Sequence, residues 1–416
     1  MKTHLLPKIF ILSVVVFLLS ACSKKDSPTP THPSTAPTIS TLSVTQGSYN
    51  TSVVISGTNF SSTVADDKVF FNGKAATVTA ATATQLTATV PLGAGTGNVT
   101  VSVKDGAVVT GPVFTYQLSY AASVLAGSSV AGEVNGTGVA AAFNLPRFIA
   151  IDAAGNLFIT DSDPVVRKIT PQGVVTSYAG LSKIPGNNGT VTSQQLNQPC
   201  SVAFDKDGNL LTGDAHTGII WKITSQGSVS ILKNNANAIF SFSLPEGLAV
   251  AKDGTIYMTD TFDNILYKIT TQGVGTWLAG SGQQGFANGK GKAASFNSPT
   301  GVATDAAGNV YVVDGTNPHV RKITPDGTVS DFTPPAFAGA FSLAFNSTGN
   351  LFVADSSTGV ISKVSSTGVV TPFAGKGSLN GVATGLTFSG LQGIAIDSND
   401  NIYVENGNQI TKIVYQ

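Results

Sequence analysis

The chain has 416 residues, too many for one ordinary domain, so two or three domains are expected. Its 23 basic and 23 acidic residues cancel, and no basic stripe supports a nucleic-acid partner. Only 11% of residues are charged, and the 45 glycines occur with abundant threonine and valine, which favours an all-β chain of short strands and tight turns.

The first segment has the pattern of an export signal. Lys2 and Lys8 precede an apolar run over residues 9–19, which is shorter than the roughly 20 residues that a helix needs to cross a bilayer. The run ends in Leu19-Ser20-Ala21-Cys22. This ending resembles the lipobox of bacterial lipoproteins, which implies a signal peptide over residues 1–21 and lipidation of Cys22. An ordinary secretory signal followed by a chance cysteine is the alternative.

Residues 22–36 are rich in Ser, Thr, Lys and Pro and have no apolar periodicity, so they are predicted to form a solvated, flexible linker. Several acyl chains on Cys22 would anchor the chain firmly to a membrane. The lipoprotein resemblance, with Ser23 after the cysteine, implies an outer-membrane lipoprotein on the periplasmic or the cell-surface side. With Cys22 acylated, Cys200 is the only other cysteine, so no intramolecular disulfide is expected.

Residues 37–117 are predicted to form a first domain of short strands. Strand candidates lie at residues 52–56, 68–71, 75–78 and 99–103, and Asn72-Gly73 is a hairpin signal between two of them. About 80 residues of such strands suit an immunoglobulin-like sandwich.

This segment resembles the IPT/TIG family. The matching pieces are Ile55-Ser56-Gly57-Thr58-Asn59-Phe60, Phe70-Phe71-Asn72-Gly73 and the closing Gly111-Pro112-Val113-Phe114-Thr115-Tyr116. The resemblance implies a spacer or interaction module and brings no catalytic residues with it.

Residues 118–416 contain six copies of one unit. Each complete copy has four strands of alternating pattern joined by short turns, and its length is roughly 40 to 50 residues, as in a propeller blade. The central alanines of the six copies are Ala150, Ala203, Ala249, Ala303, Ala344 and Ala395. The repeats therefore predict a six-bladed β-propeller.

The sixth copy stops at residue 416, before its fourth strand. The missing strand is found ahead of the first copy, because residues 122–127 match the fourth strand of the third copy at residues 275–280, and the match continues without a gap to Pro146 and Pro299. We therefore expect the start of this domain to complete the sixth blade and close the ring.

The units resemble NHL repeats. The resemblance rests on the pattern Pro-x-Gly-[Ile/Val]-Ala-x-Asp-x-x-Gly-Asn-[Leu/Val]-[Tyr/Phe]-Val-x-Asp and on Arg-Lys-Ile-Thr-Pro-Asp-Gly-Thr-Val at residues 321–329. It implies an NHL-type six-bladed β-propeller after the IPT/TIG sandwich, and it does not imply one activity, since propellers host unrelated functions. The loop after the repeat aspartate departs from the family pattern at residues 162–166 and 356–359. The resemblance therefore does not imply that this chain shares a ligand bound by that loop.

One acidic residue recurs in every unit. Because a binding site needs asymmetry, a residue required by each blade is interpreted as a cap of a turn rather than as part of a carboxylate ring. The series is Asp161, Asp214, Asp260, Asp314 and Asp355, with Glu405 in the sixth unit.

The candidate ligand-binding residues are those that break the repeat. The residue after the leading position of each unit should approach the channel mouth, and these residues are Arg147, Cys200, Glu246, Thr300, Phe341 and Gln392. Arg147 and Glu246 stand two blades apart and either bind a polar ligand or pair with each other. The ligand candidates are Arg147, Glu246 and Gln392, together with Asp163, His216, Phe262, Asp263, Asn264, Asn317 and His319 from loops of the same face.

The residues fit three kinds of enzymatic site incompletely. A three-histidine zinc site, as in amidating lyases of propeller fold, lacks a third histidine beside His216 and His319, since His32 lies in the linker. A gluconolactonase-type cation site has Glu246 but no matching Asn and Asp. A nucleophile at Cys200 with His216 is less favoured than inert packing of a buried cysteine. No metal, cofactor or catalytic residue is therefore predicted.

The sequence favours a monomeric envelope lipoprotein that acts as a binding or scaffold module, with the propeller face binding a glycan, peptide or protein. The first alternative is a propeller enzyme, a lyase or a metal-dependent, lactonase-like hydrolase acting at the channel mouth. The second is a purely structural propeller that organises an envelope complex.

Overall fold

The computed structural model describes residues 36–117, 120–180, 196–226, 228–375 and 387–415. Over these residues it is all β, apart from three single-turn 3₁₀ segments, η1 (Val64–Asp66), η2 (Gly138–Ala140) and η3 (Gly291–Ala293). The predicted signal peptide, the predicted lipidation site Cys22 and the predicted linker up to residue 35 lie outside the described residues. No helix in the described part of the chain is long and apolar enough to cross a membrane.

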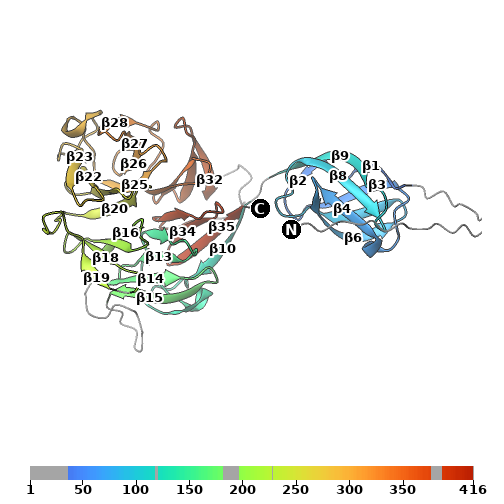
Figure 1. Cartoon of the computed structure of the whole chain (residues 1–416), viewed down its shortest axis with the longest axis horizontal. Helices are drawn as coiled ribbons and strands as arrows, with labels where there is room; N and C mark the ends of the chain where they lie inside the picture. Colours follow the sequence, from blue (N-terminus) through green and yellow to red (C-terminus); the bar gives the residue numbers. More distant parts are fainter. Residues whose placement is uncertain (1–35, 118–119, 181–195, 227, 376–386, 416) are drawn as a thin grey trace, which may run out of the picture.

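The first domain is a sandwich of two sheets (Figure 1). One sheet has the order β1 (Thr38–Leu42), β3 (Ser52–Thr58), β7 (Gln85–Thr89) and β6 (Thr77–Thr82), and the other has β2 (Gln46–Gly47), β9 (Val109–Tyr116), β8 (Gly97–Val103), β4 (Asp67–Phe71) and β5 (Lys74–Ala75). The predicted hairpin is confirmed, because Asn72 and Gly73 join β4 to β5 with φ values of 49° and 79°, the left-handed conformation that a two-residue turn requires.

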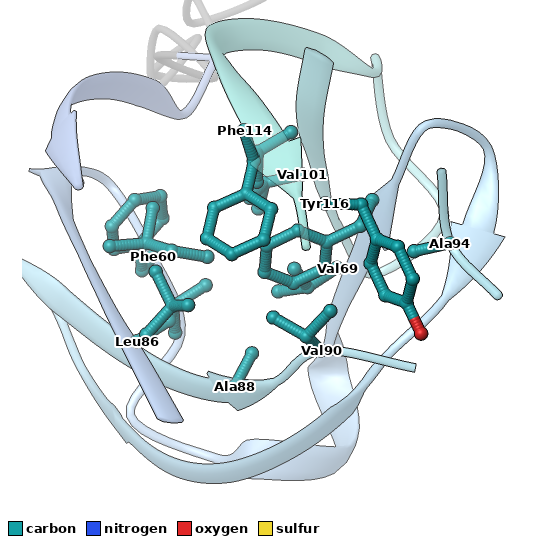
Figure 2. Close-up of a cluster of buried hydrophobic side chains, with 13 residues drawn as sticks. Phe60, Val69, Leu86, Ala88, Val90, Ala94, Val101, Phe114 and Tyr116 are labelled. Carbon is teal, nitrogen blue, oxygen red and sulfur yellow. The ribbon is translucent and has the colours of Figure 1, made fainter. Parts of the chain in front are cut away.

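The sandwich core lies between the two sheets. Figure 2 shows Leu86 of β7, Phe114 of β9 and Phe60 of the loop after β3 pointing toward one another. The rings of Phe71 and Phe114 meet edge to face at 5.0 Å, an arrangement that adds to the stability gained from burial. Alternate strand residues therefore fill one continuous apolar core, as the strand pattern predicts.

The remaining sheets form six blades (Figure 1), numbered here in the order of the sequence units. Blade 1 contains β12 (Ile149–Ile151), β13 (Leu157–Thr160), β14 (Val165–Ile169) and β15 (Val174–Gly180), blade 2 contains β16 (Pro199–Phe204), β17 (Leu210–Asp214), β18 (Ile219–Ile223) and β19 (Val229–Ile231), and blade 3 contains β20 (Pro245–Val250), β21 (Ile256–Asp260), β22 (Ile265–Ile269) and β23 (Gly275–Ala279).

The second half repeats this arrangement. Blade 4 contains β25 (Pro299–Thr304), β26 (Val310–Asp314), β27 (His319–Ile323) and β28 (Thr328–Asp331), blade 5 contains β29 (Ala340–Phe345), β30 (Leu351–Asp355), β31 (Val360–Val364) and β32 (Val370–Gly375), and blade 6 contains β33 (Ile394–Ile396), β34 (Ile402–Asn406), β35 (Gln409–Tyr415) and β10 (Tyr120–Ala126). Two blades have a short fifth strand from the preceding connector, β11 (Gly136–Thr137) on β15 and β24 (Gly289–Lys290) on β28.

The expected ring closure is observed. Strand β10 pairs antiparallel with β35, with Ala122 opposite Ile413 and Ser123 opposite Lys412 (Figure 1). Two segments far apart in the sequence thus share blade 6, which removes an open strand edge from the ring.

The repeat aspartates hold the connectors between blades. Asp161 accepts the backbone N–H of Asn144, and Asp260 accepts those of Ser243 and Leu244. The same contact recurs for Asp214, Asp314 and Asp355. These aspartates are therefore structural caps, as the repeat pattern predicts. We call the face of the propeller that carries the connectors the top face.

Candidate functional site

An ion pair spans the channel at the top face. Arg147, directly before β12 of blade 1, places Nη2 2.5 Å from Oε1 of Glu246 in β20 of blade 3. Its guanidinium carbon also lies 5.4 Å from the ring centroid of Phe341 in blade 5. The side chain of Arg147 is 26% exposed and that of Glu246 only 6%, so the pair is reached from solvent on the arginine side. Of the two roles predicted for these residues, pairing is the one observed.

The other oxygen of Glu246 is also occupied. Thr261 Oγ1 donates a hydrogen bond of 3.0 Å to Glu246 Oε2. Both carboxylate oxygens therefore have partners, and one of these is a cation. A metal ion bound at Glu246 would face the charge of Arg147, which opposes the lactonase-like site considered from the sequence.

The assignment of Glu405 to the aspartate series is wrong by one residue. Val404 pairs with Ile394 as Ile159 pairs with Ile149, so the residue that corresponds to Asp161 is Asn406. Asn406 Oδ1 accepts the N–H of Ser389 at 2.9 Å, the contact that the aspartates make elsewhere. The error arose because Glu and Asp were matched by chemical type, whereas the register of the strands decides which residues correspond.

Glu405 therefore replaces a small side chain. The corresponding residues of the other blades are Thr160, Gly213, Thr259, Val313 and Ala354. Glu405 is completely buried, and its Oε2 accepts the N–H of Gly393 at 2.8 Å. Burial raises the pKa of Glu405 to about 8, although the N–H of Gly393 and the charge of Arg147 both act to lower it.

Two buried oxygens at this place have no hydrogen-bond partner among the described residues. They are Oε1 of Glu405 and Oε1 of Gln392, the candidate at the start of blade 6. Buried acceptors without donors are rare in proteins and call for an explanation by a proton, a water molecule or a ligand. We call Arg147, Glu246, Gln392 and Glu405 the mouth cluster.

The mouth cluster lies at one end of the central channel. A cavity of about 350 Å³ is lined by the inner strands of all six blades, and in blade 1 its lining begins at Phe148, the residue after Arg147. Phe148 packs on Phe341 with ring centroids 5.1 Å apart. The Arg147 side chain and these two rings therefore separate the cavity from the top face.

Cys200 is completely buried, with Sγ 3.3 Å from the carbonyl oxygen of Pro245. Burial, reinforced by the nearby carboxylate of Glu246, raises the pKa of the thiol far above its usual range. Because the thiolate is the reactive form, this environment favours the predicted inert packing over a nucleophile. His216 is an exposed loop residue.

Several loop candidates hold the loops themselves together. Asn264, which is 4% exposed and has a φ of 55°, accepts the N–H of Ser298 at 2.8 Å. Asn317 Nδ2 donates to the carbonyl of Gly285 at 3.0 Å, and Asp263 accepts a hydrogen bond from Ser243 Oγ. Their polar groups thus have partners within the fold, which sequence alone did not indicate.

The other loop candidates differ in exposure. His319 Nδ1 lies 2.8 Å from the carbonyl oxygen of Thr333, and its ring is 4.5 Å from that of Phe286. Phe262 is 71% exposed, and Asp163 is partly exposed. Among the described residues, no group of three or more His, Cys, Asp and Glu side chains is arranged to hold a metal ion.

Two family models match the chain, the IPT/TIG domain over residues 37–116 and the SMP-30/Gluconolactonase/LRE-like region over residues 148–354. The chain is an IPT/TIG sandwich followed by a propeller of this kind. No curated protein matches the chain.

Solved structures share this architecture at low identity. An auxiliary nutrient binding protein from Bacteroides ovatus is 18% identical with a TM-score of 0.65, covering 93% of this chain and 100% of that one. A structural genomics protein of unknown function from Bacteroides thetaiotaomicron is 18% identical with a TM-score of 0.59, covering 92% and 99%. A putative gluconolactonase is 11% identical with a TM-score of 0.50, covering 71% and 92%. These similarities establish the shared fold.

Proposed function

We propose that this chain is a binding protein whose propeller holds a polar ligand at the mouth cluster. The observation that carries the proposal is the pair of buried oxygens on Gln392 and Glu405 that have no donor within the described chain. A ligand that donates a hydrogen bond to Gln392 Oε1 and accepts one from the protonated Oε1 of Glu405 would remove an unfavourable feature of the free protein. Arg147, which is partly exposed, supplies donors for the oxygens of the same ligand.

The ligand class that fits these groups best is a carbohydrate. Sugar hydroxyls donate and accept at once, so one ring can pair with the amide oxygen of Gln392 and the carboxyl group of Glu405 on one side and with a guanidinium on the other. The ring of Phe341, which lies beneath Arg147, offers an apolar surface of the kind on which the C–H face of a sugar packs. A glycan is therefore preferred here to a peptide or a protein.

The proposal includes the place of the protein in the cell. Cys22 would carry the lipid anchor on the outer membrane, residues 22–36 would form the tether, and the sandwich of residues 37–117 would act as the spacer below the propeller of residues 118–416. Such an arrangement holds a binding face away from the membrane surface. The nutrient binding protein from Bacteroides ovatus, which shares the fold over nearly its whole length, supports a binding role in this setting.

A glycan array probed with the lipid-free protein tests the proposal, followed by calorimetric titration with the best glycan. Arg147→Ala and Gln392→Ala should each weaken that glycan by about tenfold, the loss of one good polar contact. Thr348→Ala, in an exposed turn at the opposite end of the blade, is the matched control and should bind as the wild type does. Unchanged affinity in both mouth variants, or no bound glycan, would refute the proposal.

One observation favours an enzyme as the second candidate. The raised pKa of Glu405 keeps this carboxyl largely protonated near neutral pH, which is the state that a general acid requires. Incubation of the best glycan with wild type and Glu405→Gln, followed by mass spectrometry, separates the two functions. Product formed by the wild type and lost in Glu405→Gln, with binding retained, would establish the enzyme.

A further inference from the structure

Blades 1 and 4 each contain one buried arginine, whose side chain fills the space beside the outer strands of the blade. Arg167 and Arg321 are both completely buried at the middle of the third strand of their blades. The guanidinium of Arg321 lies 2.9 Å from the carboxylate of Asp314 and over the ring of Phe296 at 5.6 Å. That of Arg167 lies 3.7 Å from the carboxylate of Asp161.

The long connector before each of these blades completes the packing. Arg167 donates to the carbonyls of Val134 and Ala142 and to Asn135 Oδ1. The connector then pairs as β11 with β15, and β24 pairs with β28 in the same way. An arginine, an aspartate, a phenylalanine and an extended segment therefore form one unit of packing in each of the two blades.

Blade 5 keeps part of this unit and lacks the rest. Strand register places Ser362 where Arg167 and Arg321 stand, since it is opposite Val353 as Arg321 is opposite Val312. Asp355 still caps the connector through the N–H of Ala338, and Phe337, in the position of Phe296, is still buried. The aspartate and the ring are present, but the arginine is not.

In the described part of the chain, the covering segment is also missing from blade 5. The connector between blades 4 and 5 is short, and β32 is the edge strand of its sheet in the described structure. Val370 is only partly buried, whereas the corresponding Val175 and Val329 are 1% and 2% exposed beneath β11 and β24. The exposed fraction of Val369 at the rim is 58%.

A groove occupies the place of the missing arginine and segment. Its volume is about 670 Å³, and its lining includes Asp355, Ser362, Val369, Val370, Pro334 and Ala336. Most of the lining is apolar, while the carboxylate of Asp355 gives it one negative charge. The groove thus has the shape and the charge of the element that the chain itself supplies in blades 1 and 4.

We propose that this groove binds an extended segment of a partner protein that inserts an arginine side chain beside Asp355. The backbone of the segment would add to the free edge of β32, as β11 adds to β15, and its small residues would cover Val370. The guanidinium would lie between the carboxylate of Asp355 and the ring of Phe337, the arrangement that Arg321 has with Asp314 and Phe296. This surface lies beside blade 5, outside the mouth cluster.

The test is a selection of displayed random twelve-residue peptides on the lipid-free protein, with Ser362→Arg as the counter-target. Ser362→Arg places within the chain the arginine found in blades 1 and 4, so it should fill the groove. We expect the selected peptides to contain an arginine, and synthetic copies to bind at least tenfold more weakly when that arginine is replaced by neutral citrulline. The same peptides should lose at least tenfold in affinity for Ser362→Arg.

Two variants control this experiment. Val369→Trp, at an exposed position, obstructs the groove without added charge and should also block the peptides, so the outcome does not depend on the folding of Ser362→Arg. Gln226→Arg adds the same charge in an exposed turn of blade 2 and should bind normally. No enriched peptide, tolerance of citrulline, or equal binding to all variants would overturn the proposal. Dimerisation of the wild type that Ser362→Arg abolishes would replace the partner with a second copy of this chain.

Discussion

Arg147 of blade 1 binds Glu246 of blade 3 across the channel, yet the two side chains differ in their access to water. Arg147 is 26% exposed and Glu246 is 6% exposed. Loss of Glu246 therefore leaves a cation that can turn toward solvent, whereas loss of Arg147 leaves a buried carboxylate without its counter-charge.

The stability of the two variants should differ accordingly. Arg147→Ala is expected to lower the free energy of unfolding by about 3 kcal/mol, the lower end of the range for breaking a buried pair. Glu246→Gln should cost about 1 kcal/mol, because its amide keeps the hydrogen bond from Thr261 and Arg147 relaxes outward. Urea unfolding of both variants measures the difference in the free energy of unfolding. Equal losses in the two variants would show that hydration of Arg147 does not compensate for the loss of Glu246.

Glu405 should make stability depend on pH. Its pKa is about 8 in the folded protein and near 4.3 in an unfolded chain, so between these values the folded state holds a proton that the unfolded state has released. The free energy of unfolding should therefore fall by up to about 1.4 kcal/mol per pH unit as the pH rises from 5 to 8.

Glu405→Gln isolates this contribution, since glutamine has nearly the same shape and no titrating proton. Urea unfolding at several pH values should show that the free energy of unfolding of the variant rises relative to that of the wild type as the pH rises. Near pH 5 the two values should differ little. A constant difference over the range would mean that Glu405 is ionised in the folded state.

The fold could be predicted because the repeats and the strand patterns repeat the same information in every blade. Each unit carries alternating apolar residues and a capping aspartate, so the packing of one blade predicts that of the next. The match between residues 122–127 and 275–280 predicted closure by β10. In a closed ring, a blade that lacks its fourth strand must receive that strand from another part of the chain.

The site could be predicted only in part, because it depends on single residues that break the repeat. Arg147 and Glu246 were found by comparing equivalent positions, but their pairing depends on the width of the channel. Glu405 was misplaced by one residue because its acidic character resembled that of the capping aspartates. The groove of blade 5 was missed because Ser362 is an unremarkable residue in a strand, and its meaning depends on the buried Arg167 and Arg321.

The two buried arginines should differ in how much they contribute to the free energy of unfolding. Arg321 makes a 2.9 Å contact with Asp314, whereas Arg167 lies 3.7 Å from Asp161, whose pKa is raised to about 7 by burial. An aspartate that is partly protonated near pH 7 loses less when its arginine is removed.

Arg321→Ala should therefore lower the free energy of unfolding by about 4 kcal/mol at pH 7, and Arg167→Ala by less. Chemical unfolding at pH 7 and at pH 8.5 checks the reason as well as the order. The gap between the variants should narrow at the higher pH, where Asp161 is ionised more fully in the wild type and is left unpaired in Arg167→Ala. If Arg167→Ala lost more free energy of unfolding than Arg321→Ala at pH 7, partial protonation of Asp161 would not explain the difference between the two arginines.

Closure of blade 6 leads to a prediction about where the propeller can be cut. Strand β10 covers β35 along most of its length, with Tyr120 opposite Tyr415 at one end and Ala126 opposite Ile410 at the other. A chain that begins at residue 118 keeps this strand, and a chain that begins at residue 135 loses it. The shorter chain should melt at a lower temperature and scatter more light on heating, because the edge of β35 and the apolar residues beneath β10 are uncovered. Since the two chains share every other blade, an unchanged, cooperative melting temperature in the shorter one would mean that β10 contributes nothing to ring closure.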